Sequence, residues 1–454
     1  MRLFSAVFPN VRRLACGLIL LAVVVATVDR PPRAASAEPA AKPANEFKGR
    51  WVNRKTGRPA PESDLPPRPR TVRPAAHTDV TGEPVPRDAS GEDAAADASL
   101  KEPRPLDVTN AKPLPGYSEK SGSGQPDGDK VMAVAFEKTE QAKSLADYTE
   151  ILRLCQGVLA DPDAASSHAY ASELASWALN RRGQLLADQA VLAASQDPTA
   201  AAEYDQQALA DFEASIQLGP ERWLAYHNRG VSLALAGDLD GATADFTRTI
   251  ELRPQFPKAW FNRAEIRVQS KRFREALGDY SQAIKLTSED ADAFAGRALC
   301  RRQLGDLSGA LADYQQAARL DPKNAVAIVG RADTFAELRQ WEPAAKDYRA
   351  AIELDPTSAA AFQGAGWLMA TCPVDRYRNE DLALKAATRC VELGGASPAA
   401  LDTLAAAQAN RGDFAAARQT ITEAIQLLPP DASQPLKNRL RLYERGVPYR
   451  QPAG

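Results

Sequence analysis

Hydrophobic and polar positions follow a helical period over most of this chain. From about residue 130 onward, alanine and leucine recur at i, i+3, i+4 and i+7, and runs of β-branched residues are rare. Glycine or proline interrupts the pattern roughly every 15–20 residues. The pattern predicts a succession of helices, including two at about 130–144 and 146–160. A final capping helix is expected at 434–446, ended by Gly446 and Pro448.

One eight-residue pattern occurs four times at a constant step. It reads AYHNRGVS at 225–232, AWFNRAEI at 259–266, AFAGRALC at 293–300 and AIVGRADT at 327–334, so each copy begins 34 residues after the previous one. Self-similarity near this period predicts stacked two-helix units. Each such unit leaves an apolar face uncovered, which its neighbours must cover. The expected fold is therefore an all-α array of repeats.

The repeated units resemble the tetratricopeptide repeat (TPR). That family has an aromatic residue, a small residue four positions later, a second small residue twelve after that, an aromatic four on, a small residue three on and then a proline. The unit at 223–256 follows this order with Tyr226, Gly230, Ala242, Phe246, Thr249 and Pro254. The resemblance implies a TPR-type α-solenoid, a right-handed superhelix whose concave groove is lined by the first helix of each pair.

The resemblance covers roughly residues 130–431 and divides the chain. Four regular repeats without gaps span 223–358. Degenerate repeats are expected at 129–222, where residues 190–202 lengthen one unit. Two further TPR-like repeats are expected at 359–431, followed by a capping helix and tail at 432–454.

TPR proteins bind peptides through the exposed face of their first helices, which implies where a ligand would bind here. Asn228 and Asn262 match asparagines that hold a peptide backbone in some members, although Gly296 and Gly330 stand there in the next two repeats. The other candidate binding residues at matching positions are Asn180, His227, Phe261, Gln363 and Trp367. Phe261 and Trp367 are candidate hot spots for binding, with packing against the neighbouring repeat as the alternative. His227 would add pH sensitivity if it lines the groove.

An arginine recurs at one position of the first helix and an aspartate at one position of the second. One interpretation is an arginine ladder for an anionic ligand, and the other is a structural ion pair in each repeat. Co-occurrence of the two favours the pair, because guanidinium and carboxylate groups bond in a two-pronged geometry. We expect each arginine to contact an aspartate. The residues are Arg182, Arg229, Arg263, Arg297 and Arg331, with Asp211, Asp245, Asp279, Asp313 and Asp347.

The N-terminal part has a different composition. Arg2, Arg12 and Arg13 precede the apolar run LACGLILLAVVVATV and an A-x-A-like site, which predicts a signal peptide at 1–37 and an exported, periplasmic or secreted protein. The alternative is an uncleaved N-terminal membrane anchor, the only membrane contact expected. Residues 38–128 are rich in proline and poor in hydrophobic residues, which predicts a disordered linker. Within it, EFKGRWVN at 46–53 is a possible docking motif or an incidental part of the linker.

Composition and motifs narrow the function. The formal net charge is −2, which does not indicate a nucleic-acid partner. The chain has three histidines and no phosphate loop, metal-ligand cluster or nucleophile elbow, so we expect neither catalysis nor a cofactor or metal. Once the signal is removed, four cysteines remain, which we expect as buried apolar side chains, with oxidation after export as the alternative.

The sequence therefore predicts a non-enzymatic scaffold or adaptor outside the cytoplasm. It would bind a protein or peptide partner, as an extended segment or a helix, in the groove. Two alternatives remain open at this point. One is an envelope structural or assembly component that uses the array as a tethered spacer. The other is a regulatory subunit of an enzyme encoded elsewhere.

Overall fold

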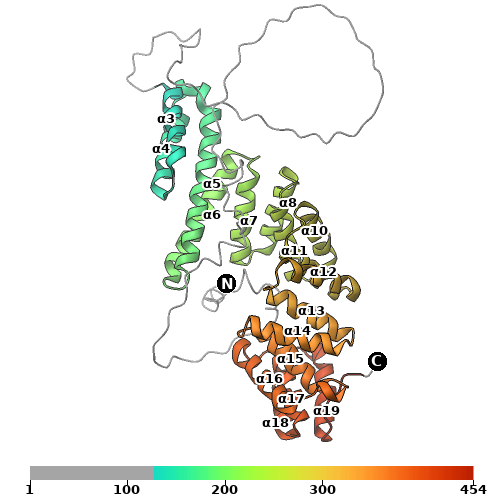
Figure 1. Ribbon diagram of the computed structural model, residues 1–454. Helices are drawn as coiled ribbons and strands as arrows, with labels where there is room; N and C mark the ends of the chain where they lie inside the picture. The colour runs from blue at the N-terminus through green and yellow to red at the C-terminus, as the bar shows by residue number, and fades with distance from the viewer. Residues whose placement is uncertain (1–126, 453–454) are drawn as a thin grey trace, which may run out of the picture. The chain divides into compact units, whose positions relative to one another are not determined.

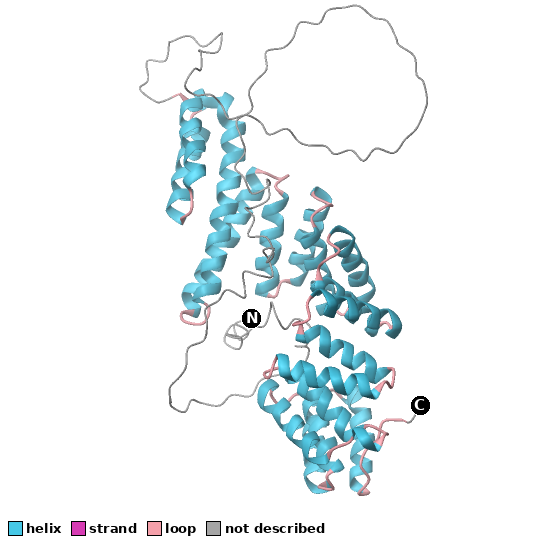
Figure 2. Cartoon of the chain, in the orientation of Figure 1, coloured by secondary structure: helices cyan, strands magenta, loops and turns pink. Residues whose placement is uncertain are grey.

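The computed structural model describes residues 127–452, which form an all-α fold (Figures 1 and 2). Seventeen α-helices, α3 to α19, follow one another, and no strand occurs between residues 127 and 452. The predicted fold class, an α-solenoid of paired helices, is confirmed. The signal peptide predicted at 1–37 lies outside the described residues, as does all but the end of the linker predicted at 38–128.

The described chain divides into two compact units. The N-terminal unit holds residues 127–190 and 202–225, and the C-terminal unit holds 191–201 and 226–452. Helices α5, α6 and α7 contribute residues to both units. The helices that build the N-terminal unit are α3 (Gly128–Gln141), α4 (Leu145–Ala160), the 3-10 helix η2 (Pro162–Ser167), α5 (His168–Ala193), α6 (Pro198–Leu218) and the start of α7 (Trp223–Ala236).

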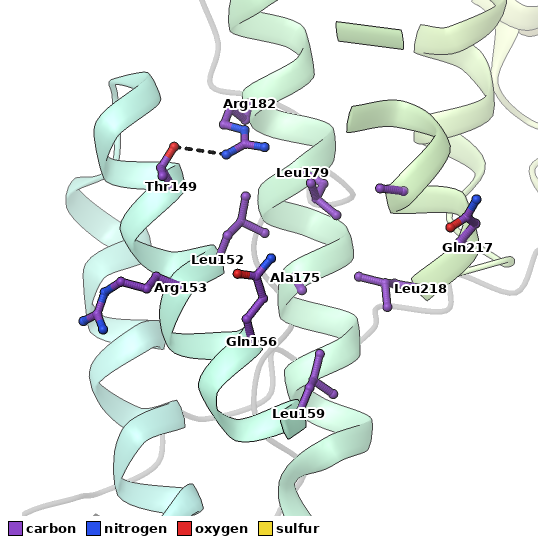
Figure 3. A pocket seen from close by; sticks show the side chains of 11 residues that line it. Thr149, Leu152, Arg153, Gln156, Leu159, Ala175, Leu179, Arg182, Gln217 and Leu218 are labelled. Atoms are coloured by element: carbon purple, nitrogen blue, oxygen red, sulfur yellow. Dashed lines mark hydrogen bonds between the residues drawn. The ribbon is translucent and has the colours of Figure 1, made fainter. Parts of the chain in front are cut away.

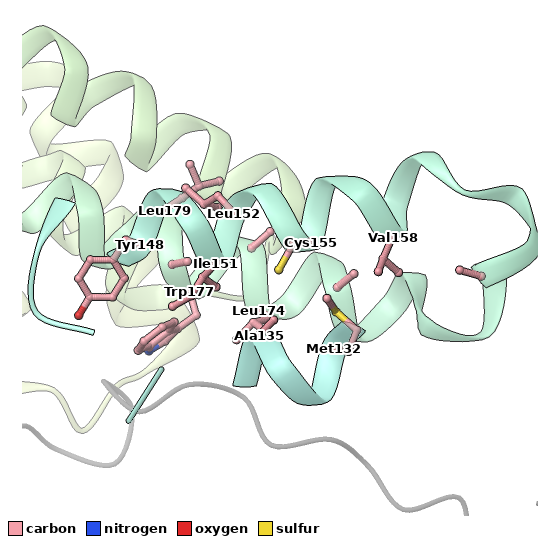
Figure 4. Close-up of a cluster of buried hydrophobic side chains, with 14 residues drawn as sticks. Met132, Ala135, Tyr148, Ile151, Leu152, Cys155, Val158, Leu174, Trp177 and Leu179 are labelled. Carbon is pink, nitrogen blue, oxygen red and sulfur yellow. The ribbon is translucent and has the colours of Figure 1, made fainter. Parts of the chain in front are cut away.

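A single hydrophobic cluster holds α3, α4 and α5 of the N-terminal unit together (Figure 4). Ile151 from α4 and Leu174 from α5 are fully buried. Tyr148 and Trp177 pack edge to face with their ring centroids 5.7 Å apart. Such an aromatic pair contributes about 0.5–1.5 kcal/mol beyond the area that it buries. The cluster therefore fixes α4 against α5.

Capping residues explain where these helices begin. Asp127 accepts a hydrogen bond from the backbone of Asp129 and starts α3 two residues earlier than predicted. Ser144 and Asp147 form a reciprocal capping box, in which each side chain accepts from the other's backbone N–H. This box starts α4 at Leu145, so the predicted helix at 130–144 ends at Gln141 instead.

The C-terminal unit is a stack of helix pairs followed by a capping helix (Figure 1). After α7, its helices are α8 (Leu239–Leu252), α9 (Pro257–Gln269), α10 (Phe273–Leu286), α11 (Ala291–Gln303), α12 (Leu307–Leu320), α13 (Ala325–Glu337), α14 (Trp341–Leu354), α15 (Ala359–Thr371), α16 (Glu380–Gly394), α17 (Pro398–Asn410), α18 (Phe414–Gln426) and α19 (Gln434–Glu444). The short 3-10 helices η3 (Asp375–Tyr377) and η4 (Pro430–Ser433) lie within the connections. The predicted capping helix at 434–446 corresponds to α19.

The turn between the two helices of a repeat requires a left-handed residue. Gly237, Gly305 and Gly412 take φ values of 87°, 86° and 89° there, which glycine adopts without steric cost. Lys271 and Arg339 occupy the same place in two other repeats, with φ values of 58° and 59°. In the glycine repeats the next residue accepts backbone hydrogen bonds as the N-cap of the second helix, and these caps are Asp238, Asp306 and Asp413.

Small residues and rings alternate between the helices of the stack. Ala264 and Ala276 are fully buried where α9 meets α10. The ring of Tyr280 on α10 reaches the next repeat, where a Cβ added at Gly296 on α11 would lie 2.4 Å from its Cζ atom. The rings of Tyr314 and Tyr348 lie just as close to Gly330 and Gly364. A tyrosine in the second helix thus requires a glycine in the following first helix.

The cysteines and the membrane prediction can be checked in the described residues. Four cysteines are buried as free thiols, as the sequence predicted: Cys155, Cys300, Cys372 and Cys390. Burial raises the pKa of Cys300 to about 12 and that of Cys390 to about 11, which keeps both protonated near neutral pH. Within residues 127–452, none of the helices combines the length and the apolar character that crossing a membrane requires.

Candidate binding surface

The first helices of successive repeats form a continuous row in the C-terminal unit. Each packs on the second helix of its own repeat, and α9, α11, α13, α15 and α17 also contact each other in sequence. We call the surface that these helices and α7 share the first-helix face. It is where the predicted binding residues of this unit lie. Asn180 belongs to α5 in the N-terminal unit.

Each recurring arginine bonds the aspartate of its own repeat. In every pair the arginine Nε and Nη2 donate to the two carboxylate oxygens, over distances of 2.6–2.9 Å. The partners lie 16 residues apart in the regular repeats and 29 apart in the N-terminal unit, where residues 190–202 intervene. The five pairs are Arg182–Asp211, Arg229–Asp245, Arg263–Asp279, Arg297–Asp313 and Arg331–Asp347. The expected contacts are all present, and the two-pronged bonds match the structural interpretation.

His227 does not line an open groove, contrary to the sequence-based expectation. It is 5% exposed and packs against Phe246 and Phe256, with ring centroids 5.6 and 4.9 Å away. Its Nδ1 is buried without a hydrogen-bond partner. Burial, with a smaller contribution from the positive charge of Lys258, lowers the pKa of His227 to about 3. The two aromatic rings explain the difference, because they cover the imidazole.

Burial of His227 makes stability depend on pH. Its ordinary pKa is about 6.5, so the unfolded chain takes up a proton below that pH while the folded chain does not until about pH 3. Unfolding then binds a proton, and stability falls as the pH falls. We expect the free energy of unfolding to drop by about 1.5 kcal/mol between pH 6.5 and 5 through this group alone. Urea unfolding at the two pH values, compared with His227→Phe, measures it, and an equal drop in both proteins would contradict the assignment.

The candidate binding asparagines are more buried than the sequence-based expectation of an exposed face required. Asn180 and Asn262 are only 1% and 3% exposed, so neither side chain projects into solvent. Asn228 and Gln363 are partly buried. Asn262 is unusual because both its Oδ1 and its Nδ2 are buried without any hydrogen-bond partner. An amide left in that state destabilises the folded chain by about 1–3 kcal/mol.

The aromatic hot spots predicted from the sequence are both packed. Phe261 meets Tyr280 edge to face with ring centroids 5.7 Å apart. Trp367 lies against Tyr449, with ring centroids 5.8 Å apart, and the guanidinium carbon of Arg439 stands 5.4 Å from the ring of Trp367. Phe261 thus contacts the second helix of its own repeat, and the side chains of Phe261 and Trp367 are both partly buried. For Trp367 the cover comes from the capping helix and the chain after it.

Charged groups beside these residues are joined into networks. The hydroxyl of Tyr280 donates to Glu265, and that of Tyr348 donates to Asp333 over 2.7 Å. Arg302 reaches across from α11 to Asp333 on α13, with a 2.7 Å contact. Between α9 and α13 the first-helix face therefore contains two carboxylates bonded by neighbouring side chains, of which Glu265 is buried and Asp333 is partly exposed.

The N-terminal unit contains a separate open cleft of about 500 Å³ (Figure 3). Leucines from α4, α5 and α6 line it together with polar side chains at its edge. Arg182 on this edge bonds Thr149 over 3.1 Å as well as Asp211, and Arg153 pairs with Glu150. In the described part of the chain, no three His, Cys, Asp or Glu side chains gather in a way that would hold a metal ion.

Comparison with known families identifies the repeats. A tetratricopeptide repeat model matches residues 190–257 and 261–325. The chain is a tetratricopeptide repeat protein. The matched residues include the last part of the lengthened unit and three of the four regular repeats. TPR proteins are in general scaffolds for protein–protein interaction, which gives the broad class of function.

Several solved structures are similar to this TPR protein. YrrB, described as a TPR protein with an unusual peptide-binding site, is 23% identical over 42% of this chain and 95% of its own, with a TM-score of 0.35. A TPR protein from Parabacteroides merdae is 14% identical over 58% and 98%, with a TM-score of 0.43. The APC/C hetero-tetramer Cut9–Hcn1 is 14% identical over 69% and 55%, with a TM-score of 0.46. No curated protein sequence matches the chain.

Proposed function

We propose that this TPR protein is an adaptor that binds an extended segment of a partner protein along its first-helix face. The single observation that carries this proposal is the amide of Asn262. Each polar atom of that side chain is buried, and neither has a partner among residues 127–452. A peptide backbone offers both an N–H donor and a C=O acceptor, which match the Oδ1 and Nδ2 of an asparagine. A rotation of the side chain toward the face would let one peptide unit satisfy both.

The chemistry around Asn262 supports a peptide as the ligand. Asn262 lies on α9, one turn before Glu265, whose carboxylate accepts from Tyr280. On α13, Val326 is 37% exposed, and Asp333 and Glu337 stand near the guanidinium of Arg302. The face thus combines apolar area with carboxylates of fixed position. Such a surface suits an extended segment with apolar and basic side chains.

Export of the protein is part of the same proposal. It is supported by the arginines before the apolar run at 14–28 and by the A-x-A-like site at 35–37. Mass spectrometry of the protein recovered from the envelope or medium tests it. A mature chain that begins at Glu38 would support export with cleavage, and an intact Met1 in the cytoplasmic fraction would contradict it.

Replacing Asn262 should separate binding from stability. The change Asn262→Ala removes an unsatisfied buried amide, so we expect the free energy of unfolding to stay equal or to rise by about 1 kcal/mol. The same change should weaken partner binding by about tenfold or more, because the contact to the peptide backbone is lost. Urea unfolding measures the first effect, and capture from the native envelope or extracellular fraction measures the second.

A matched variant controls for the loss of an asparagine as such. Asn438 is exposed on α19 and bonds Gln434 in its own helix, so Asn438→Ala should change neither stability nor capture. If Asn262→Ala instead lowers stability by several kcal/mol, or leaves capture intact, the amide serves the fold and the proposed function fails.

A further inference from the structure

The last described residues return over the first-helix face instead of leaving the C-terminal unit. At the end of α19, Gly446 takes a φ of 71°. Its N–H donates to the carbonyl of Tyr443 over 3.1 Å, and the N–H of Val447 donates to that of Leu442 over 2.9 Å. This pair of bonds is the Schellman motif, which ends a helix and turns the chain. The residues after it, 447–452, are here called the tail.

The tail bonds to the C-terminal end of α15. The last carbonyls of a helix have no N–H partner within the helix. The carbonyl of Ala370 accepts from Nη1 of Arg450 over 3.0 Å, and that of Thr371 accepts from the backbone N–H of Gln451 over 2.9 Å. The side-chain amide of Gln451 also donates to the hydroxyl of Thr371 over 2.8 Å. The positive charge of Arg450 lies at the negative end of the helix dipole, which stabilises the contact.

An aromatic contact holds the tail beside these bonds. The ring of Tyr449 packs on Trp367, and the guanidinium carbon of Arg439 stands 5.2 Å from the centre of the Tyr449 ring. Arg439 is itself held by Asp402 on α17, through bonds of 2.7 and 2.6 Å to the two carboxylate oxygens. The receiving surface, made of α15, α17 and α19, is therefore built from residues that fix one another.

We propose that the tail is a ligand bound in cis, and that the surface beneath it receives an extended partner segment in which an aromatic residue directly precedes an arginine. The inference rests on the proposed function, because it adds a second peptide site to the same first-helix face. The tail contacts described above are an aromatic ring on Trp367, an arginine on a helix end and a backbone N–H on a carbonyl. A separate peptide in which an aromatic residue directly precedes an arginine makes the same three contacts.

The structure also explains why the tail is exchangeable. The turn after α19 is closed by the N–H of Val447, so α19 keeps its end whether or not the rest of the tail is bound. Val447 is 41% exposed. A short tether holds the tail at an effective concentration on the order of millimolar, so even a weak segment fills the site until a tighter partner displaces it.

A peptide with the tail's own sequence tests the site. The probe is a fluorescein-labelled peptide of residues 446–454, added to the full chain and followed by anisotropy. We expect the chain with Tyr449→Ala and Arg450→Ala to bind the probe about tenfold more tightly than the unchanged chain, because its own tail no longer competes. Adding Trp367→Ala should abolish binding. A probe with the same two alanine changes should not bind.

Two outcomes would overturn the proposal. The first is absence of probe binding to the doubly changed chain when its thermal unfolding matches that of the unchanged chain. The second is measured by hydrogen exchange on the unchanged chain. We expect the backbone amide of Gln451 to exchange at least tenfold faster than the amides in the buried core of α15. Equal protection of these amides would mean that the tail is permanently bound and is not an exchangeable ligand. Either result leaves the Asn262 test of the proposed function standing, because that test concerns α9 and a different ligand.

Discussion

Removing the carboxylate of Asp279 should destabilise the protein more than any other change considered for the repeats. Asp279→Ala is expected to lower the free energy of unfolding by about 3–5 kcal/mol, because it leaves buried cations without their partner. The Asp279 side chain is 4% exposed, and it accepts from Arg263 and from Arg267, whose side chains are 11% and 16% exposed. Urea unfolding followed by circular dichroism measures the loss.

An exposed carboxylate on the same helix provides the control for Asp279. Glu275 pairs with Arg272 three residues before it, and both side chains are 45% exposed. Exposed pairs of this kind contribute little to stability, so Glu275→Ala should change the free energy of unfolding only slightly. Equal effects of the two changes would mean that the repeated Arg–Asp pairs do not stabilise the stack.

Gly296→Ala should have the second largest effect, with a loss of about 2 kcal/mol. Alanine favours a helix over glycine, so propensity alone predicts a gain. The added Cβ, however, would lie 2.4 Å from Cζ and 2.6 Å from the hydroxyl oxygen of Tyr280, both in a fully packed interface. The ring has to move, and it also donates to Glu265, so the strain extends to the first-helix face.

Gly278 allows a direct comparison for Gly296. It lies on α10, and a Cβ there would meet no atom within 4 Å. Gly278→Ala should therefore raise the free energy of unfolding by up to about 1 kcal/mol, through helix propensity. The two glycine changes are expected to differ in sign. A gain for both, in thermal or urea unfolding, would show that the tyrosine ring can move aside without cost.

These two predictions concern the packing and ion-pair contacts that support the first-helix face. Glu265 on the first-helix face is positioned by Tyr280, which in turn packs on Gly296 of the next repeat. The Arg263–Asp279 pair ties the same first and second helices together. A surface that rests on interlocked side chains keeps its groups in place for a ligand. Changes in these contacts are thus expected to weaken binding as well as stability.

Much of the fold could be predicted from the sequence, because equivalent residues make the same local contacts in each repeat. A constant step places equivalent residues at equivalent points, so the pairing of Arg297 with Asp313 could be inferred from their recurrence. The same holds for the small residues between helices, such as Ala264 and Ala276. Helix boundaries were less certain, because caps such as Ser144 depend on one side chain.

The binding residues were predicted less well, since exposure depends on neighbours far along the chain. His227 has the position of a groove residue, yet Phe256, from the loop before the next helix, covers it. Trp367 is covered by Tyr449, 82 residues later, in a tail with no repeat pattern. The only sequence signal for that contact was an aromatic and an arginine just after a glycine and a proline.

The sequence by itself determined the helix pairs, their period and the ion pair in each repeat, because these are contacts between residues at short and constant separation. Only the tertiary structure decided which of the first-helix residues remain accessible. Their accessibility depends on long-range packing, because aromatic rings near the next repeat, the capping helix and the tail each cover part of the first-helix face. It also left both polar atoms of the Asn262 amide without a hydrogen-bond partner among the described residues.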